Sequence, residues 1–341
     1  MRAKLLGGDD IRTGFVHFNV MERGKLREIA AVKYPERVAQ KSINQNALMP
    51  SVADTLINDN SANVKGKGTS FAVKRMVRHL AKHYAEHGCE GYILLGDFKG
   101  FFPSIPHDGA KELVRACLDD EAVIRLICEQ IDAQGGDRGL TLGSEINQTL
   151  AVAYPSRIDH FVVECCDVEA YGRYMDDFYA IHTSKEHLQL VLGCIEAISC
   201  ELGLTLNAKK THIVKLTHGF TYLKRKFSYD ERGHVVVRPV RTTFTRERRR
   251  LKKHARLVAE GRMTYEQACE SYQSWRGHLL KMDAHGAVLR MDALFASLFG
   301  DRRSKISEDP PSHIFEPADH PVCETPRNPR GFLFAENDRK D

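Results

Sequence analysis

Two adjacent carboxylates interrupt an apolar stretch in Tyr171-Gly172-Arg173-Tyr174-Met175-Asp176-Asp177-Phe178-Tyr179-Ala180-Ile181. Apolar and aromatic residues on both sides of a short polar break are typical of a strand, a tight turn and a second strand. We therefore predict a hairpin that holds Asp176 and Asp177 at the rim of a sheet. Such a pair is also ordinary solvated turn chemistry, so this stretch alone leaves both interpretations open.

A second apolar strand also ends on a carboxylate. Residues 92–105 begin as an apolar run, reach Asp97 and continue into an aromatic segment. A carboxylate in that position costs free energy unless it is exposed, paired or bound to a metal. Three carboxylates on two strand ends suit two Mg2+ ions, because Mg2+ prefers oxygen ligands and keeps positions for water and phosphate. Two ions about 3.5 to 4 Å apart can activate a 3′-hydroxyl and stabilise leaving pyrophosphate, so the pattern predicts polymerase chemistry.

Three ordered segments resemble the palm motifs of reverse transcriptases. They are Asp97 with Phe101-Phe102, then Tyr174-Met175-Asp176-Asp177, then Leu202-Gly203-Leu204-Thr205-Leu206-Asn207-Ala208-Lys209-Lys210-Thr211. The resemblance covers roughly residues 13–300 and is nearest to the bacterial enzymes of diversity-generating retroelements and of antiviral defence systems. It implies an α+β right-hand polymerase, with fingers and palm of antiparallel sheet plus helices and an α-helical thumb.

The resemblance also implies roles at the reacting centre. Asp97 and Asp176 would bind both metal ions, with the Phe98 carbonyl assisting and Asp177 supporting the site. The ions would be two Mg2+, with Mn2+ as a substitute. Phe102 would lie under the sugar of the incoming nucleotide, where its ring leaves no room for a 2′-hydroxyl. Core packing is the alternative interpretation of Phe102.

Four further positions are implied to contact the substrate: Arg27, Gly143, Gln148 and Lys210. Two apolar-rich runs around a charged turn, residues 15–21 and 26–32, predict a β-hairpin that resembles the family's fingers hairpin. On it Arg27, or less well Lys25, would lie on the triphosphate, although solvated basic residues in a hairpin would look the same. Lys210 would protonate the leaving pyrophosphate, and a solvated lysine is the alternative.

The sequence departs from the family pattern at three positions. Leu142 stands where the retroviral type has glutamine, and Asn147 stands before Gln148 where retroelement relatives have serine. Lys224 replaces the glycine of the primer grip, which we expect in residues 220–227. These departures leave fidelity and subfamily open, while the polymerase class does not depend on them.

Basic residues concentrate in two segments that would contact nucleic acid. Residues 58–69 form a loop rich in Gly, Asn and Lys, and residues 241–256 hold eight Lys or Arg against Glu247 alone. That local excess is larger than the formal charge of +5 for the whole chain. A concentrated basic stripe is the usual footprint of a phosphate backbone, although a solvated helix face is the alternative. The predicted nucleic-acid contacts are Lys65, Lys67, Tyr174, Arg248, Arg249, Lys252 and Lys253.

The expected organisation is fingers and palm over residues 1–228, a thumb over 229–300 and an extended, Pro-rich charged tail over 301–341. Thr69 is expected to cap a helix, and residues 111–133 to be helical. The only tryptophan, at position 275, fits an anchor of the thumb core better than a nucleic-acid contact.

Composition bounds the class of protein. The 341 residues are 42% apolar and 28% charged, as in ordinary globular proteins. No run approaches the roughly 18 apolar residues of a membrane span, and the N-terminus lacks the apolar core of a signal peptide. Nine scattered cysteines without a Cys-x-x-Cys pair suggest neither a disulfide framework nor a zinc site. We therefore expect a cytoplasmic protein with no membrane partner.

The expected function is an RNA-directed DNA polymerase that extends a primer with dNTPs by two-metal-ion catalysis on a bacterial noncoding RNA template, in antiviral defence. A diversity-generating retroelement enzyme and a catalytically dormant nucleic-acid-binding scaffold stay open as alternatives, and so does an RNA-dependent RNA polymerase, which shares the palm. Expected partners are the RNA template, the DNA product and dNTPs. A structured noncoding RNA, an accessory or second reverse transcriptase protein, and a further copy of the chain are additional candidates.

Overall fold

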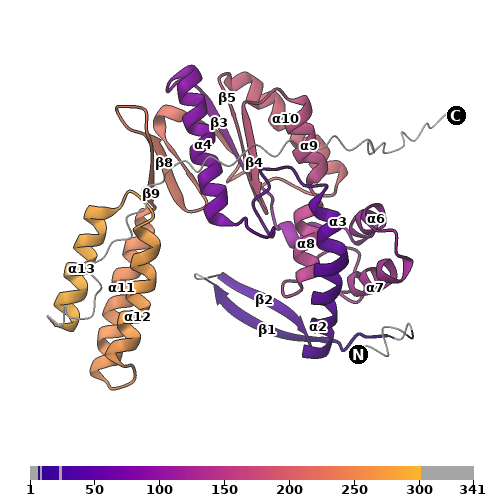
Figure 1. The fold of residues 1–341 in the computed structure, drawn as a ribbon, viewed down its shortest axis with the longest axis horizontal. Coiled ribbons are helices and arrows are strands. Elements are labelled where there is room, and N and C mark those ends of the chain that lie inside the picture. The colour runs from indigo at the N-terminus through magenta and orange to yellow at the C-terminus, as the bar shows by residue number, and fades with distance from the viewer. Residues whose placement is uncertain (1–6, 8–9, 23–24, 301–341) are drawn as a thin grey trace.

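A four-stranded antiparallel sheet in the order β4-β5-β3-β6 forms the centre of the molecule (Figure 1). The computed structural model describes residue 7 and residues 10–22 and 25–300. The strands are β3 (Tyr92–Asp97), β4 (Ala170–Tyr174), β5 (Asp177–His182) and β6 (His212–Lys215). The hairpin predicted around Asp176 is confirmed, with β4 and β5 as its arms; we call it the aspartate hairpin.

Both faces of the central sheet are covered. Leu94 and Phe178 belong to a core shared with the helices α9 (Ser156–Cys165) and α10 (Lys185–Glu201). Their strand neighbours Ile93 and Tyr179 belong to a second core shared with α4 (Thr69–His87). Successive strand residues point to opposite faces, so a sheet buried on both sides is built from continuous apolar runs. Charged groups can reach solvent only at the strand ends, which is where Asp97 and Asp177 lie.

A second sheet packs into the core on the α4 side. Its antiparallel strands are β7 (Phe220–Tyr222), β8 (Arg225–Tyr229) and β9 (Val235–Pro239). Leu223 and Lys224 connect the first two strands with φ angles of 45° and 61°, the left-handed conformation of a type I′ turn. Lys224 thus adopts the backbone that a glycine at this position would adopt without strain. The sheet extends across residue 228. The predicted boundary at 228 between fingers and palm on one side and the thumb on the other stays a prediction.

The predicted fingers hairpin is confirmed as β1 (Phe15–Glu22) paired with β2 (Lys25–Val32). Between this hairpin and α9 the chain contains further helical segments besides α4. These are α2 (Tyr34–Ile43), a π-helical turn (Asn44–Leu48), α3 (Met49–Ala53), α5 (Phe101–Ser104), α6 (His107–Cys117), α7 (Glu121–Asp132) and α8 (Glu145–Ala153).

Residues 111–133 are helical as predicted except for a break at residues 118–120. Helix α6 ends at Cys117, and the side chain of Asp120 accepts hydrogen bonds from the N–H groups of Ala122 and Val123 to begin α7. The prediction that Thr69 caps a helix was wrong. Gly68 occupies the N-cap position with φ of 142°, which favours glycine, and Thr69 is the first helical residue.

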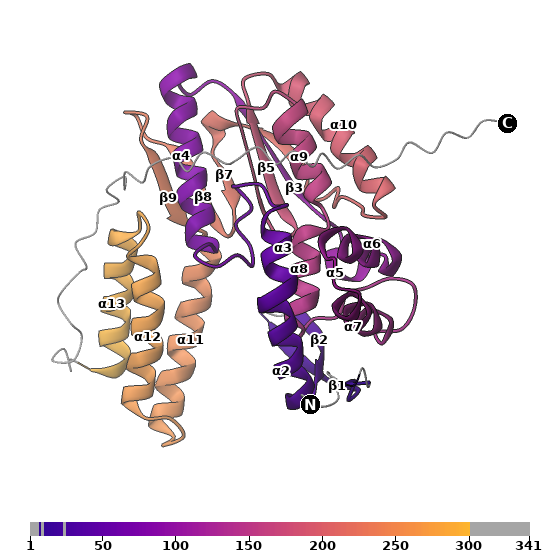
Figure 2. The same cartoon turned by 45° about the vertical axis from the view of Figure 1, so that its right-hand side comes forward.

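The predicted helical thumb consists of α11 (Arg241–Ala259), α12 (Tyr265–Leu279) and α13 (His285–Phe299), which lie side by side (Figure 2). Trp275 stacks on Tyr272, with ring centroids 5.7 Å apart, and meets Phe244 edge-on at 6.0 Å. Its expected role as a core anchor is therefore confirmed. The tail predicted over 301–341 lies outside the described residues, and no described helix is long and apolar enough to cross a membrane.

Candidate active site

Three carboxylates meet at one edge of the central sheet. Asp97 ends β3 and lies opposite Asp177, the first residue of β5, while Asp176 occupies the turn just before it. The N–H of Phe98 donates to the carbonyl oxygen of Asp176 at 3.1 Å, which holds the turn against the end of β3. The structure therefore brings together the three acids that the sequence singled out.

Asp97 is 3% exposed, and both of its carboxylate oxygens accept hydrogen bonds. Asn207 Nδ2 donates to Oδ1 at 3.0 Å, and Lys210 Nζ donates to Oδ2 at 2.5 Å. The backbone N–H of Asn207 also donates to the Asp97 carbonyl at 2.8 Å. The sequence had placed Lys210 near the triphosphate, whereas Asn207 stood inside the same motif without an assigned role.

The electrostatics of the cluster favour a cation. Burial, and the carboxylates of Asp176 and Asp97, raise the pKa of Asp177 to about 7, although Lys210 acts in the opposite direction. Burial opposes the charged form of Lys210, but its hydrogen bond to Asp97 and the attraction of the three carboxylates outweigh burial and raise its pKa. Crowded oxygen donors that repel one another are a donor set that fits a hard divalent cation.

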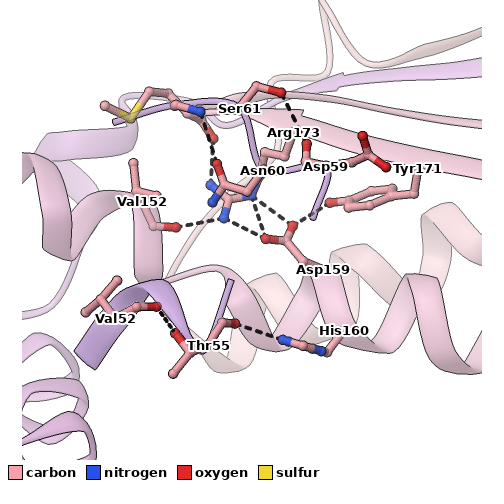
Figure 3. A network of polar contacts seen from close by, with 12 residues as sticks. Val52, Thr55, Asp59, Asn60, Ser61, Val152, Asp159, His160, Tyr171 and Arg173 are labelled. Atoms are coloured by element: carbon pink, nitrogen blue, oxygen red, sulfur yellow. Dashed lines mark hydrogen bonds and ion pairs between the residues drawn. The ribbon is translucent and has the colours of Figure 1, made fainter. Parts of the chain in front are cut away.

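The turn that carries Asp176 is held by a buried arginine (Figure 3). Met175 has a φ of 55°, which is unusual for a residue with a side chain, and its carbonyl oxygen accepts a hydrogen bond from Arg173 Nη1 at 3.0 Å. Arg173 Nη2 and Nε also bond the carboxylate of Asp159, at 2.6 and 2.8 Å, with both side chains fully buried. Arg173 Nη2 further donates to the carbonyl of Val152 at 2.7 Å, and the Tyr171 hydroxyl donates to Asp159 at 2.7 Å.

The same network attaches the loop before α4 to the aspartate hairpin. Ser61 N–H donates to the Arg173 carbonyl at 3.0 Å, and Arg173 N–H donates to the Asp59 carbonyl at 3.2 Å. The Asp59 carboxylate in turn pairs with Arg75 of α4, with Nη2 at 2.7 Å from Oδ2. Our reading of the sequence missed Arg173 and Asp159. For Arg173 the available signal was a single charge within an apolar strand, since a buried charge requires a partner. Asp159 gave no such signal, because α9 also carries Arg157 and Glu164.

The residues predicted to contact the nucleotide differ in burial and in their neighbours. Phe102 is half-buried and meets Phe101 edge-on, with centroids 5.8 Å apart, so it is not a fully buried core residue. Gly143 has a φ of 125° and lies against β2, since a Cβ atom there would come within 2.9 Å of the Ala30 carbonyl oxygen. Gln148 is half-buried on α8. Arg27 pairs with Val20 through its backbone, but its side chain lies outside the described residues.

The predicted nucleic-acid contacts lie in the loop before α4, at the end of β4 and on α11, and they differ in exposure. Lys65 is exposed, whereas Lys67 donates to the Asn58 carbonyl at 2.6 Å and lies 5.2 Å from the centre of the Phe71 ring. Burial lowers the pKa of Lys67. Its hydrogen bond to the Asn58 carbonyl attaches it to its own loop. Tyr174 is half-buried at the end of β4, opposite Asp177. The thumb residues Arg248, Arg249, Lys252 and Lys253 are all exposed on α11.

A cavity of about 580 Å³ separates the second sheet from the thumb. The charged side chains that line it are all basic: Lys226, Arg238, Arg241, Arg248 and Arg290. Because Arg248 belongs both to this cavity and to the predicted basic stripe, the stripe extends from α11 onto the sheet. A concave surface with one sign of charge attracts a polyanion more strongly than separate surface lysines do.

Comparison with known proteins identifies the class of this fold. Residues 17–227 match the model of the reverse transcriptase (RNA-dependent DNA polymerase) family. A search of curated proteins found no match to the sequence. Apo telomerase from Candida tropicalis is similar in structure, with a TM-score of 0.53 and 15% identity over 84% of this chain and 58% of that chain.

Telomerase from the same organism in complex with the TWJ fragment of telomeric RNA gives a TM-score of 0.50 and 13% identity, over 84% of this chain and 55% of that chain. This chain therefore spans little more than half the length of those telomerases. At such identities the similarity shows a common fold, and that fold is the predicted right-hand polymerase of mixed helices and antiparallel sheet.

Proposed function

The chain belongs to the reverse transcriptase (RNA-dependent DNA polymerase) family, and from that membership we propose that it extends a primer with dNTPs on an RNA template. The observation that carries the proposal is the meeting of Asp97, Asp176 and Asp177 at one edge of the central sheet. Burial, together with repulsion by the carboxylates of Asp176 and Asp97, raises the pKa of Asp177 to about 7.

Asp97 and Asp176 would hold two divalent cations, with Asp177 and the Phe98 carbonyl completing the donor set. When bound, the ions would activate the primer 3′-hydroxyl and stabilise the departing pyrophosphate. Mg2+ suits a set made of oxygen donors, and Mn2+ would substitute for it. Lys210 carries a proton beside these acids and would donate it to the pyrophosphate, exchanging its bond to Asp97 for one to phosphate.

Substrate selection would come from the residues around this edge. Phe102 would exclude the 2′-hydroxyl, which favours dNTPs over ribonucleotides. Gly143 and Gln148 would border the nascent base pair, and Arg27 would contact the triphosphate from the fingers hairpin. The path of the template–primer duplex would run along the basic cavity between α11 and the second sheet, because its five basic side chains match a phosphate backbone.

The proposal is tested by primer extension with purified protein, an annealed RNA template, dNTPs and Mg2+. We expect synthesis by the wild type that depends on Mg2+ and is absent from Asp176→Asn. Asp108→Asn is the matched control, because that side chain is 95% exposed and lies 4.0 Å from Lys111 Nζ, outside the cluster of the three acids. Synthesis by Asp176→Asn at the wild-type rate would refute the site. Absence of synthesis by the wild type, with RNA still bound, would favour the dormant scaffold.

We further propose that the natural template is a bacterial noncoding RNA and that the setting is antiviral defence, in the cytoplasm. This part rests on the motif resemblance and on the basic cavity, and a diversity-generating retroelement is the alternative. Sequencing of nucleic acid that copurifies with the wild type, beside Asp176→Asn, would identify the template. cDNA from one invariant noncoding RNA in the wild type alone supports the proposal. cDNA of a variable protein-coding repeat would favour the retroelement.

A further inference from the structure

Two histidines and a glutamate meet outside the active site, where the end of α4 lies beside the start of β4. His83 and His87 are one turn apart on α4, and Glu169 directly precedes β4. One ligand atom from each of the three lies within 4.8 Å of the others. Glu169 Oε2 is 2.5 Å from His83 Nδ1, and Glu169 Oε1 is 3.7 Å from His87 Nε2.

The two ring nitrogens of His83 both face acceptors. Nε2 lies 2.7 Å from the carbonyl oxygen of Glu90, so it must carry a proton and donate it. A neutral imidazole has one donor and one acceptor nitrogen, which leaves Nδ1 as an acceptor directed at the Glu169 carboxylate. Two acceptors this close require a cation between them, either a second proton on the ring or a metal ion. A proton shared by His83 and Glu169 would need no further ligand. A metal ion would need one, and the imidazole of His87 lies at the same carboxylate.

We propose that His83, His87 and Glu169 bind one Zn2+ ion, which joins α4 to the central sheet. Two imidazole nitrogens and one carboxylate form a typical zinc ligand set, with water in the fourth position. Mg2+ is disfavoured, because it prefers oxygen ligands. Zinc–ligand distances of about 2.0 to 2.1 Å would require His83 and Glu169 to separate slightly and His87 to move inward.

The surroundings already orient these ligands. Metal-binding histidines usually donate their second ring N–H to a carbonyl or carboxylate, as His83 does to Glu90. The Thr183 N–H donates to Glu169 Oε1 at 3.1 Å, which holds the carboxylate. Gly91 provides the space for the His83 ring, since a Cβ at position 91 would lie 2.5 Å from Nε2. His83 is 2% exposed, so its orientation is fixed by packing.

The site is distinct from the proposed catalytic ions. Glu169 stands at the beginning of β4, whereas the turn with Asp176 follows its end at Tyr174. Five strand residues span about 16 Å. A metal at this distance would act on stability, by fixing α4 over one face of the sheet, and not on the chemistry.

The test measures zinc content of the full chain, purified without a histidine tag. We expect about one Zn2+ per chain after dialysis in the wild type, at least about tenfold less in His87→Ala and in Glu169→Gln, and the wild-type amount in Asp176→Asn. His160→Ala is the matched control, because His160 lies outside this cluster, where its ring nitrogens are 2.7 Å from Glu164 Oε1 and 2.8 Å from the Thr55 carbonyl. Added zinc should raise the melting temperature of the wild type, Asp176→Asn and His160→Ala, and leave that of His87→Ala and Glu169→Gln unchanged.

His87 is half exposed, so His87→Ala should fold, which circular dichroism would verify. Substitution by Co2+ gives a second readout, since a tetrahedral site produces visible absorption that the two variants should lack. The proposal is overturned if the wild type retains no zinc, which would leave a proton as the cation between His83 and Glu169. It is also overturned if the two variants retain the wild-type amount.

Discussion

The aspartate hairpin and the fingers hairpin have the same secondary structure and opposite surroundings. The aspartate hairpin lies inside the protein, with Arg173 and Asp159 paired at zero exposure beneath its turn. The fingers hairpin displays apolar side chains to solvent, among them Phe18 at 47% exposure and Met21 at 65%. It meets the helices around α8 through a backbone hydrogen bond of 3.1 Å from Ala30 N–H to the Leu142 carbonyl.

The aspartate hairpin is thus held rigidly by buried contacts, whereas the fingers hairpin lies on the surface. Metal ligands must be held within a fraction of an ångström to be effective, and the aspartate hairpin meets that requirement with charged bonds in a low-dielectric interior. A hairpin that contacts an incoming nucleotide must instead let it enter and leave. Changes in the aspartate hairpin should therefore affect catalysis or global stability, while changes at the fingers hairpin should affect nucleotide binding.

The largest effect is expected for Asp97→Asn. Synthesis should fall to background, because the substitution removes a charge from the proposed metal site, while the melting temperature stays within a few degrees of the wild type. The fold should persist because Asn207 and Lys210 have solvent-facing alternatives to their bonds with Asp97. Primer extension and thermal unfolding measure the two quantities. Loss of folding would mean that Asp97 is a structural residue, contrary to the site proposed here.

Arg173→Met should cost both stability and activity. It leaves Asp159 buried without its partner, and breaking one side of a buried ion pair costs about 3 to 5 kcal/mol of unfolding free energy. The double variant Arg173→Met with Asp159→Leu should recover much of that stability, because two apolar side chains can replace a buried pair. It should remain inactive, since the Met175 carbonyl still lacks its donor.

Urea unfolding and primer extension distinguish these outcomes. Full activity of the double variant would show that the turn of the aspartate hairpin keeps its geometry without Arg173. The position of Asp176 would then depend on the pairing of β4 with β5 alone. A cost below about 1 kcal/mol for Arg173→Met would mean that water reaches Asp159.

The site and the main elements could be predicted because their signals are local. Asp97 and Asp176 each interrupt an apolar run, and the thumb helices follow from periodic apolar residues. The Arg173–Asp159 pair could not be predicted in this way, because its two members come from separate elements, β4 and α9, that meet only after folding. The break before α7 was missed for a related reason. The apolar spacing continues across it, and only the hydrogen bonds of Asp120 show where α7 begins.

Gly143 lies against β2 of the fingers hairpin, and Gly143→Ala should moderately weaken nucleotide binding with a smaller loss of stability. A methyl group at a φ of 125° would lie 2.9 Å from the Ala30 carbonyl and push β2 away. We expect a higher KM for dNTPs with global stability reduced by about 1 to 3 kcal/mol. Gly193→Ala is the matched control, because that helical position has open space around it and alanine should be neutral or stabilising. An unchanged KM in Gly143→Ala would show that the contact between Gly143 and β2 does not contribute to nucleotide binding.

The smallest effect on stability is expected for Phe102→Ala, which tests the chemistry of the substrate. The ring is half-buried and packs edge-on against Phe101, so its loss should be partly tolerated. If Phe102 excludes the 2′-hydroxyl, the variant should incorporate ribonucleotides, and dNTP incorporation should fall much less. Phe18→Ala, which removes an exposed ring from the fingers hairpin, should leave the ratio unchanged. Competition between dNTPs and rNTPs measures that ratio. An unchanged ratio in Phe102→Ala would assign the ring to packing, whereas a wild type that prefers rNTPs would favour an RNA-dependent RNA polymerase.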